Sequence, residues 1–294
     1  MSGSYGDLFV TADDGIRLYA RDYGPLTGHA SLPVVGLPGL ARTSEDFHDI
    51  AEALSRDPSR PRRVLCLDYR GRGRSEWDRD WRNYDVKVEL NDTLQVLAAA
   101  RIQKAIFIGT SRGGLITMAL SAVRPELIAG AVLNDVGPVL EARGLKRIRS
   151  YVGKLPTPGT VSEAVDLLRQ RSQSQFPHYS DEQWAKMARG TWRETEGGFV
   201  LDYDPNLTKT LDNLDLDAPL PDLWPLFEAL KPFPVLAIRG DHSDLLTADT
   251  LQMMQDRHSR LTAVTVPDQG HAPSLDGDLL PVIRDFVSAV DGRD

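Results

Sequence analysis

The chain has one cysteine, no long apolar run and fewer basic than acidic residues. A single cysteine, Cys66, forms no intrachain disulfide, which excludes a disulfide-stapled scaffold. No apolar stretch reaches the roughly 18–20 residues that a membrane-spanning helix needs. The net charge of -8 disfavours a nucleic-acid or anionic-membrane partner. Paired cysteines and a His-Glu-x-x-His motif are also missing, so we expect neither a catalytic metal nor a cofactor.

The start of the chain and its composition favour a cytoplasmic globular protein. Residues 1–7 lack both the basic and the apolar region of a signal peptide. With 41% hydrophobic and 26% charged residues, the chain of 294 residues can bury a substantial core. We therefore expect a cytoplasmic monomer or homodimer that takes a small molecule and contacts neither nucleic acid nor membrane.

Short apolar segments alternate with helical patterns along most of the chain. Asp14-Gly15 separates segments 8–12 and 17–21, which predicts an opening hairpin. Further strands are predicted at 32–36, 64–68, 106–109, 131–133, 235–238 and 261–266, and helices at 44–54, 86–100, 115–122 and 279–290. This order predicts an α/β fold with a mostly parallel central sheet and helices on both faces.

Residues 138–232 break the alternation, because they contain no clear buried strand. Helical patterns occur at 162–170, 181–189 and 222–230. The simplest interpretation is a helical cap, or lid, inserted into a core made of residues 1–137 and 233–294. We expect aromatic side chains of this segment to line an apolar acyl pocket: Trp184, Trp192, Tyr203, Trp224 and Phe227.

The strongest chemical signal is the Gly-x-Ser-x-Gly motif centred on Ser111. It follows the apolar run 105–108 and precedes the helical segment 115–122. Strand, sharp turn and helix in this order are typical of a nucleophile elbow, with Gly109 and Gly113 letting strand and helix pass closely. We therefore predict Ser111 as a nucleophile. The amide of Arg112, at the helix start, would stabilise a developing oxyanion.

A serine nucleophile needs a base, and the base needs an orienting carboxylate. We predict His271 as the base, because it follows the last strand in a loop bounded by glycine and proline. For the carboxylate we favour Asp244, which lies deep in the loop after 235–240, ahead of an apolar anchor. Asp241 in the same loop and Asp135 after 131–133 remain alternatives.

The second oxyanion donor should come from the loop after strand 32–36, since ligands bind at the carboxyl ends of parallel strands. Gly39 would allow close backbone approach, so we predict the amide of Leu40 as this donor. Asp68 to Ser75 forms another glycine-rich loop, but its spacing does not match a nucleotide-binding motif.

Four of these segments together resemble the α/β-hydrolase fold superfamily, in its lidded serine esterase type, over essentially the whole chain. They are Leu37-Pro38-Gly39-Leu40, Asp68 to Ser75, the Ser111 elbow and Gly270-His271. The chain departs from the pattern twice. Many members have histidine where this chain has Pro38, and many place the acid where it has Ser243.

The serine at the elbow favours acyl transfer to water, whereas dehalogenases and epoxide hydrolases of this fold use aspartate there. We expect a cofactor-independent carboxylesterase that cleaves esters with a small to medium, largely apolar acyl group through an acyl-enzyme. A lactonase, a carbon–carbon bond hydrolase or a non-catalytic ligand receptor with a vestigial triad remain alternatives.

Overall fold

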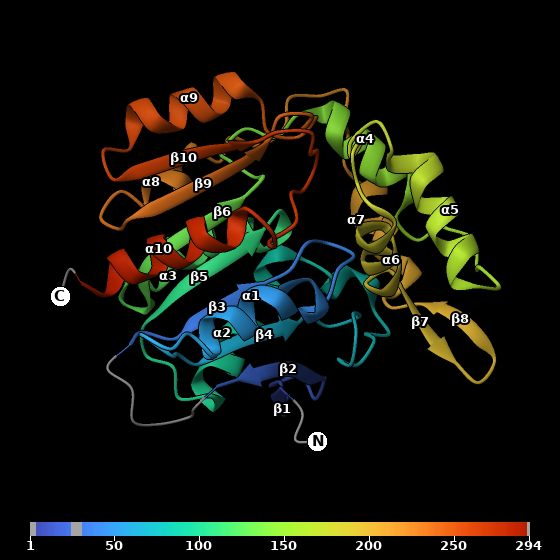
Figure 1. Ribbon diagram of the computed structural model, residues 1–294, viewed down its shortest axis with the longest axis horizontal. Coiled ribbons are helices and arrows are strands. Elements are labelled where there is room, and N and C mark those ends of the chain that lie inside the picture. The colour runs from blue at the N-terminus through green and yellow to red at the C-terminus, as the bar shows by residue number, and fades with distance from the viewer. Residues whose placement is uncertain (1–3, 25–30, 293–294) are drawn as a thin grey trace.

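The computed structural model describes residues 4–24 and 31–292. Within these residues, eight strands form one sheet in the order β1-β2-β4-β3-β5-β6-β9-β10 (Figure 1). They are β1 (Tyr5–Thr11), β2 (Arg17–Tyr23), β3 (Val34–Leu37), β4 (Val64–Asp68), β5 (Ala105–Thr110), β6 (Ile128–Asn134), β9 (Val235–Gly240) and β10 (Leu261–Val266). The hairpin β1–β2 pairs antiparallel, β2 joins β4 antiparallel, and all other neighbours pair parallel. The predicted α/β fold with a mostly parallel sheet is confirmed.

The central strands are apolar throughout because helices cover both faces of the sheet. Successive residues of β9 alternate between two buried clusters: Val235 and Ala237 join one, Leu236 and Ile238 the other. Helices α1 (His48–Ser55) and α10 (Leu279–Asp291) pack on the second cluster's face. The first cluster's face carries α2 (Val86–Ala99), α3 (Arg112–Val123), α8 (Trp224–Glu228) and α9 (Ala248–Arg257). Short 3-10 helices span Ser44–Phe47, Trp81–Asn83, Pro125–Leu127 and Pro205–Leu207.

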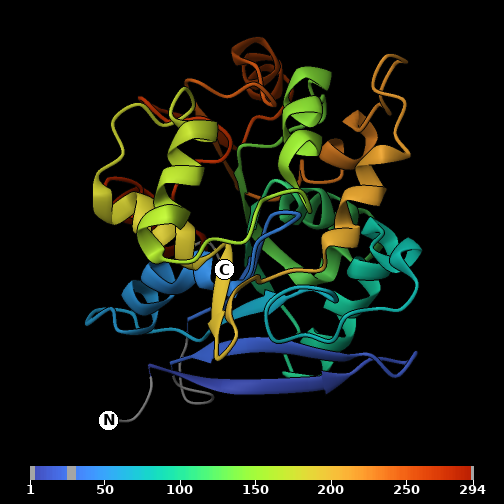
Figure 2. The ribbon, with the colours of Figure 1, turned by 90° about the vertical axis from the view of Figure 1, so that its right-hand side faces the viewer.

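Most helices and strands that do not belong to the central sheet or to the helices covering it lie in the segment between β6 and β9. It holds α4 (Ala142–Tyr151), α5 (Val161–Ser172), α6 (Asp181–Arg189), the hairpin β7 (Trp192–Thr195) and β8 (Gly198–Leu201), and α7 (Thr208–Asp212). Figures 1 and 2 show these elements grouped at one end of the sheet. We call residues 138–223 the insertion. It has an apolar cluster of its own, which includes Leu168, Phe176 and Trp184.

Two features of this region differ from expectation. The pattern at 222–230 becomes the short helix α8, which packs on the sheet through Phe227 rather than on the insertion. The hairpin β7–β8 was not predicted, because exposed Arg193 and Glu194 hide its strand pattern. No helix among the described residues is long and apolar enough to cross a membrane.

Candidate active site

Ser111 occupies the sharp turn between β5 and α3. Its φ of 50° and ψ of -110° lie in a region that side-chain-bearing residues rarely adopt. A Cβ on Gly113 would lie 1.9 Å from the Leu37 carbonyl oxygen, and one on Gly109 would lie 2.5 Å from the Gly113 carbonyl oxygen. Only glycine fits at either place, so strand and helix meet closely enough to hold the serine in this strained turn.

His271 lies beside this serine. Its Nε2 is 2.9 Å from Ser111 Oγ, and its Nδ1 is 2.8 Å from Asp135 Oδ2. A carboxylate only accepts hydrogen bonds, so Nδ1 carries the proton and Nε2 is left to accept from the serine hydroxyl. The His271 side chain is 7% exposed and that of Asp135 is fully buried. The three side chains therefore form a continuous hydrogen-bonded chain, which is buried at Asp135 and His271 and partly exposed at Ser111.

Asp135 is held in place by donors from a neighbouring loop. It directly follows β6, with a φ of +55°. The Gly240 amide donates to Oδ1 at 2.9 Å, and Ser243 Oγ donates to Oδ2 at 2.6 Å. In the sheet, β6 lies between β5 and β9. The carboxyl ends of these parallel strands therefore bring the residues that follow them to one place.

Asp244, which we predicted as the orienting acid, does not contact His271. Its two carboxylate oxygens accept from Arg147 on α4, from Nε at 2.6 Å and from Nη2 at 2.8 Å. Burial acts to raise the pKa of Asp244, but the Arg147 guanidinium holds it below its usual value. The loop after β9 turns Ser243 toward Asp135 and Asp244 toward the insertion, so the prediction for Asp244 is wrong.

The other predicted acid, Asp241, lies on the exposed side of the same loop. Its Oδ1 is 3.7 Å from His242 Nε2. With Asp268, these residues form a group whose ligand atoms lie within 4.8 Å of one another, at the exposed surface. Such a group could hold a cation, but it belongs to the outer surface and not to the site of Ser111.

Both residues predicted as oxyanion donors lie close to Ser111. Arg112 is the first residue of α3, so its amide is one of those that a helix leaves without an internal acceptor. Leu40 follows β3 in a loop that passes the nucleophile: a Cβ on Gly39 would lie 3.8 Å from Ser111 Cβ. Leu40 also lines the same cavity as Ser111. The structure thus brings both residues to the serine.

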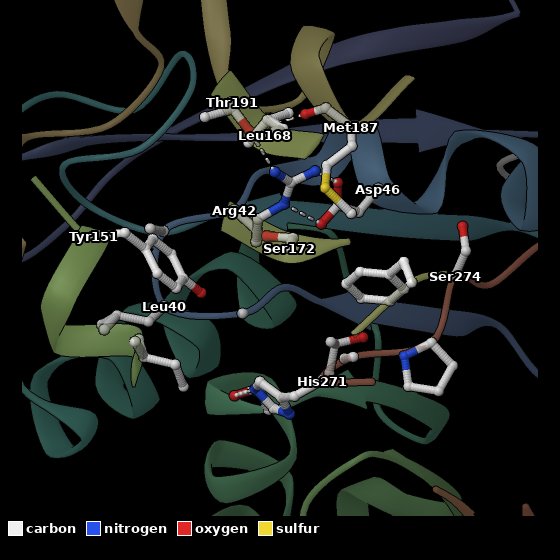
Figure 3. A pocket seen from close by; sticks show the side chains of 18 of the residues that line it. Leu40, Arg42, Asp46, Tyr151, Leu168, Ser172, Met187, Thr191, His271 and Ser274 are labelled. Atoms are coloured by element: carbon white, nitrogen blue, oxygen red, sulfur yellow. Dashed lines mark hydrogen bonds and ion pairs between the residues drawn. The ribbon is translucent and has the colours of Figure 1, made fainter. Parts of the chain in front are cut away.

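A cavity of about 200 Å³ opens over Ser111 and His271 (Figure 3). Its core-side wall consists of residues 39–42 and 271–275. The insertion supplies the opposite wall with mostly apolar and aromatic side chains, including Ile148, Tyr151, Leu155, Leu168, Phe176, Tyr179, Met187 and Tyr203. Arg42 also reaches the cavity, where it pairs with Asp46 and donates to Thr191 of the insertion at 2.9 Å (Figure 3).

Among the described residues that line this cavity, none is a tryptophan. Trp184 and Trp192 are 2% exposed and form the insertion's own core. Trp224 packs against the Arg257 guanidinium and Phe227, on the sheet side. The prediction of a tryptophan-lined pocket is therefore wrong, since Trp184 and Trp192 fill the core of the insertion and Trp224 packs on the sheet core. Of the predicted aromatics, Tyr203 does line the cavity.

Comparison with known proteins agrees with this geometry. The chain matches the family model described as alpha/beta hydrolase fold over residues 33–278. It is 36% identical over 244 residues to the 3-hydroxybutyrate-oligomer hydrolase of Cupriavidus necator, covering 81% of each chain. It is 25% identical to the sn-1-specific diacylglycerol lipase ABHD11 of Danio rerio, covering 88% of this chain and 77% of that one. A crystal structure of an alpha/beta hydrolase from Novosphingobium aromaticivorans superposes with a TM-score of 0.90 at 37% identity, covering 98% and 99% of the two chains. The chain therefore belongs to the α/β-hydrolase fold family.

Proposed function

We propose that this protein is a serine hydrolase of carboxylic esters that works through an acyl-enzyme. The observation that carries the proposal is the hydrogen-bonded series Ser111–His271–Asp135, at 2.9 and 2.8 Å. A hydroxyl that donates to an imidazole with an oriented carboxylate behind it is the arrangement that activates serine for attack on a carbonyl carbon.

The proposed reaction begins when Ser111 Oγ attacks the ester carbonyl and His271 Nε2 takes the hydroxyl proton. Asp135 keeps the imidazole in the required tautomer and stabilises the imidazolium. The amides of Leu40 and Arg112 stabilise the tetrahedral oxyanion. His271 then protonates the departing alcohol, and a water activated by the same histidine hydrolyses the acyl-enzyme.

The volume and the lining of the cavity support the proposed class of substrate. Its volume of about 200 Å³ is below the roughly 300–1,000 Å³ of pockets that take drug-sized ligands, which favours a short acyl group. The wall from the insertion is mostly apolar and aromatic. Polar groups come from Arg42 of the core and from insertion residues that include Arg147, Arg171, Lys186 and Thr191. Short esters of hydroxy acids, the class named for the relative from Cupriavidus necator, fit both properties.

We further propose that the insertion acts as a cap that completes the site. Gln175 of the insertion accepts from the His271 amide at 3.0 Å and donates to the His242 carbonyl at 3.1 Å. The Arg147–Asp244 ion pair makes a second link between insertion and core. These contacts link the insertion to the loop that carries His271 and to the loop after β9.

The test is hydrolysis of p-nitrophenyl esters of graded acyl length, with the Ser111→Ala variant beside the wild type. We expect turnover with an optimum at short acyl chains, complete loss in the variant, and unchanged circular dichroism. Dimeric and trimeric 3-hydroxybutyrate serve as the second substrate series. Equal turnover by the variant would refute the mechanism. No turnover of any ester by the wild type would favour the carbon–carbon hydrolase or receptor alternatives.

A further inference from the structure

A buried ionic network lies behind the two residues proposed as oxyanion donors. Glu89, on α2, is fully buried and pairs with two arginines. Its Oε1 is 2.7 Å from Arg72 Nη1, and its Oε2 is 2.7 Å from Arg112 Nε. One carboxylate thus joins two guanidinium groups, one from the loop after β4 and one from the first residue of α3.

Each arginine of this network is linked to one of the residues proposed as oxyanion donors. Arg72 Nε donates to the Leu40 carbonyl at 2.8 Å, and Arg72 Nη1 donates to the Arg70 carbonyl at 2.7 Å. Arg112 is itself the residue after the nucleophile, and its Nη2 donates to the Tyr84 carbonyl at 2.8 Å. The series Leu40–Arg72–Glu89–Arg112 therefore connects the two sides of the proposed oxyanion hole through side chains behind it.

Stability alone gives little reason for such a network. Burying a carboxylate and a guanidinium costs desolvation free energy that their attraction seldom exceeds, and apolar side chains of similar volume often stabilise a protein as well. A network of ion pairs and hydrogen bonds does, however, hold backbone groups such as the Leu40 and Tyr84 carbonyls in one arrangement. The reactive geometry tolerates little change, since shifts of about 1 Å reduce rates by about 100-fold.

We propose that Glu89 is a positioning residue that sets the spacing of the Leu40 and Arg112 amides around the oxyanion. The inference rests on the proposed function, because it assumes that these amides stabilise a tetrahedral intermediate. Glu89 touches neither substrate nor Ser111 and acts through the two arginines. Its contribution belongs to the transition state, because the oxyanion needs both amides more than the ground-state carbonyl does.

The same helix offers a matched control three residues further on. Asp92 is 2% exposed and pairs in a bidentate manner with Arg70, from Nε at 2.7 Å and from Nη2 at 2.6 Å. The Arg70 side chain also pairs with Asp14 and Asp78, not with Leu40 or Arg112. Asp92→Asn removes a buried, bidentate charge from α2 while both contacts of Glu89 remain, and it reaches the series only through Arg70, whose backbone carbonyl accepts from Arg72.

The experiment compares Glu89→Gln, Asp92→Asn and wild type on one p-nitrophenyl ester, with activity normalised to active sites titrated by a fluorophosphonate. We expect kcat of Glu89→Gln to fall about 10- to 100-fold, with KM within about threefold of wild type. Affinity for a trifluoromethyl ketone, which forms a hemiketal oxyanion on the serine, should fall by the same factor as kcat/KM. Asp92→Asn should change neither quantity more than about threefold.

Arg72→Lys is the second variant, used also if Glu89→Gln fails to fold. A lysine keeps the positive charge beside Glu89 but cannot hold the Leu40 carbonyl and the carboxylate with one planar group. We expect the same loss of kcat and of trifluoromethyl ketone affinity. Wild-type kinetics in folded Glu89→Gln or Arg72→Lys would overturn the role of Glu89. An equal loss of kcat in Asp92→Asn would do the same, and neither result would contradict the proposed ester hydrolase. Absence of Ser111-dependent turnover in the wild type would overturn both.

Discussion

Ser243 donates a 2.6 Å hydrogen bond to Asp135, at the same carboxylate oxygen that accepts from His271. In many proteins of this fold the acid itself stands at the position of Ser243, three residues after the glycine that ends the strand. In this chain we propose that Asp135, which directly follows β6, is the acid, and that the Ser243 hydroxyl orients its carboxylate. The proposed roles of Asp135 and Ser243 predict how replacing each residue changes kcat.

Replacing Asp135 by Asn should reduce kcat about 1,000- to 10,000-fold, because the amide no longer selects the tautomer that lets His271 accept a proton. The measurement is steady-state hydrolysis of the best p-nitrophenyl ester. Asp244→Asn and Asp241→Asn serve as controls and should each lose far less. A larger loss of kcat in Asp244→Asn than in Asp135→Asn would indicate that Asp244, the residue favoured from the sequence, is the orienting acid.

Ser243→Ala should lower kcat by about 10- to 100-fold, which corresponds to the roughly 1.5–3 kcal/mol of one hydrogen bond to a charged group such as the Asp135 carboxylate. The Ser243 hydroxyl also accepts from the amides of Leu245 and Leu246, so a modest loss of stability should accompany the change. Ser121→Ala is the control, since that buried hydroxyl donates only to the Met118 carbonyl of its own helix. Equal kcat in the two variants would contradict an orienting role.

The ion pair of Asp244 and Arg147 should stabilise the protein only while Asp244 is charged. Because the pKa of Asp244 is lowered in the folded state, this contribution is present above its ordinary value of 3.8 and is lost as the pH falls through the folded value. We expect Asp244→Asn to reduce the unfolding free energy by about 1–3 kcal/mol at pH 6, and by less as the pH drops below about 4. Urea unfolding across this range measures the difference. A difference independent of pH would exclude the ion pair as its source.

Asp68 should show the opposite dependence on pH. Its fully buried carboxyl accepts from the amides of Ser44 at 2.6 Å and Arg74 at 3.0 Å, yet burial raises its pKa to about 6. The folded state therefore holds a proton that the unfolded state releases near pH 4, so stability is lost as the pH rises from about 4 through about 6. The loss amounts to about 3 kcal/mol for a shift of this size. Asp68→Asn removes this titration. The unfolding free energy of the variant should therefore rise relative to that of the wild type as the pH increases over this interval. Parallel stability curves for the two proteins would contradict the assignment.

Much of this site could be predicted because its residues lie in short sequence motifs next to predicted strands. Gly109 and Gly113 lie within two residues of Ser111, and their lack of a Cβ is what allows strand and helix to meet there. His271 follows the last strand, and every parallel strand of a sheet presents its carboxyl end to the same edge. Pattern and sheet geometry were therefore enough to predict the nucleophile and base positions and the mostly parallel sheet.

The choice among Asp135, Asp241 and Asp244 required the folded chain. All three follow late strands, and the depth of Asp244 in its loop, which led us to favour it, does not determine which carboxylate reaches His271. The order of β5, β6 and β9 in the sheet, together with the turn that directs Ser243 inward, brings Asp135 to His271 across 136 positions of sequence. The insertion shows the same limit, since its tryptophans fill its own core and its tyrosines reach the cavity. Local pattern determined most strands of the sheet, the helices that cover it and the turn at Ser111. Packing between distant segments decided which side chains meet, because a contact depends on the whole path of the chain between them.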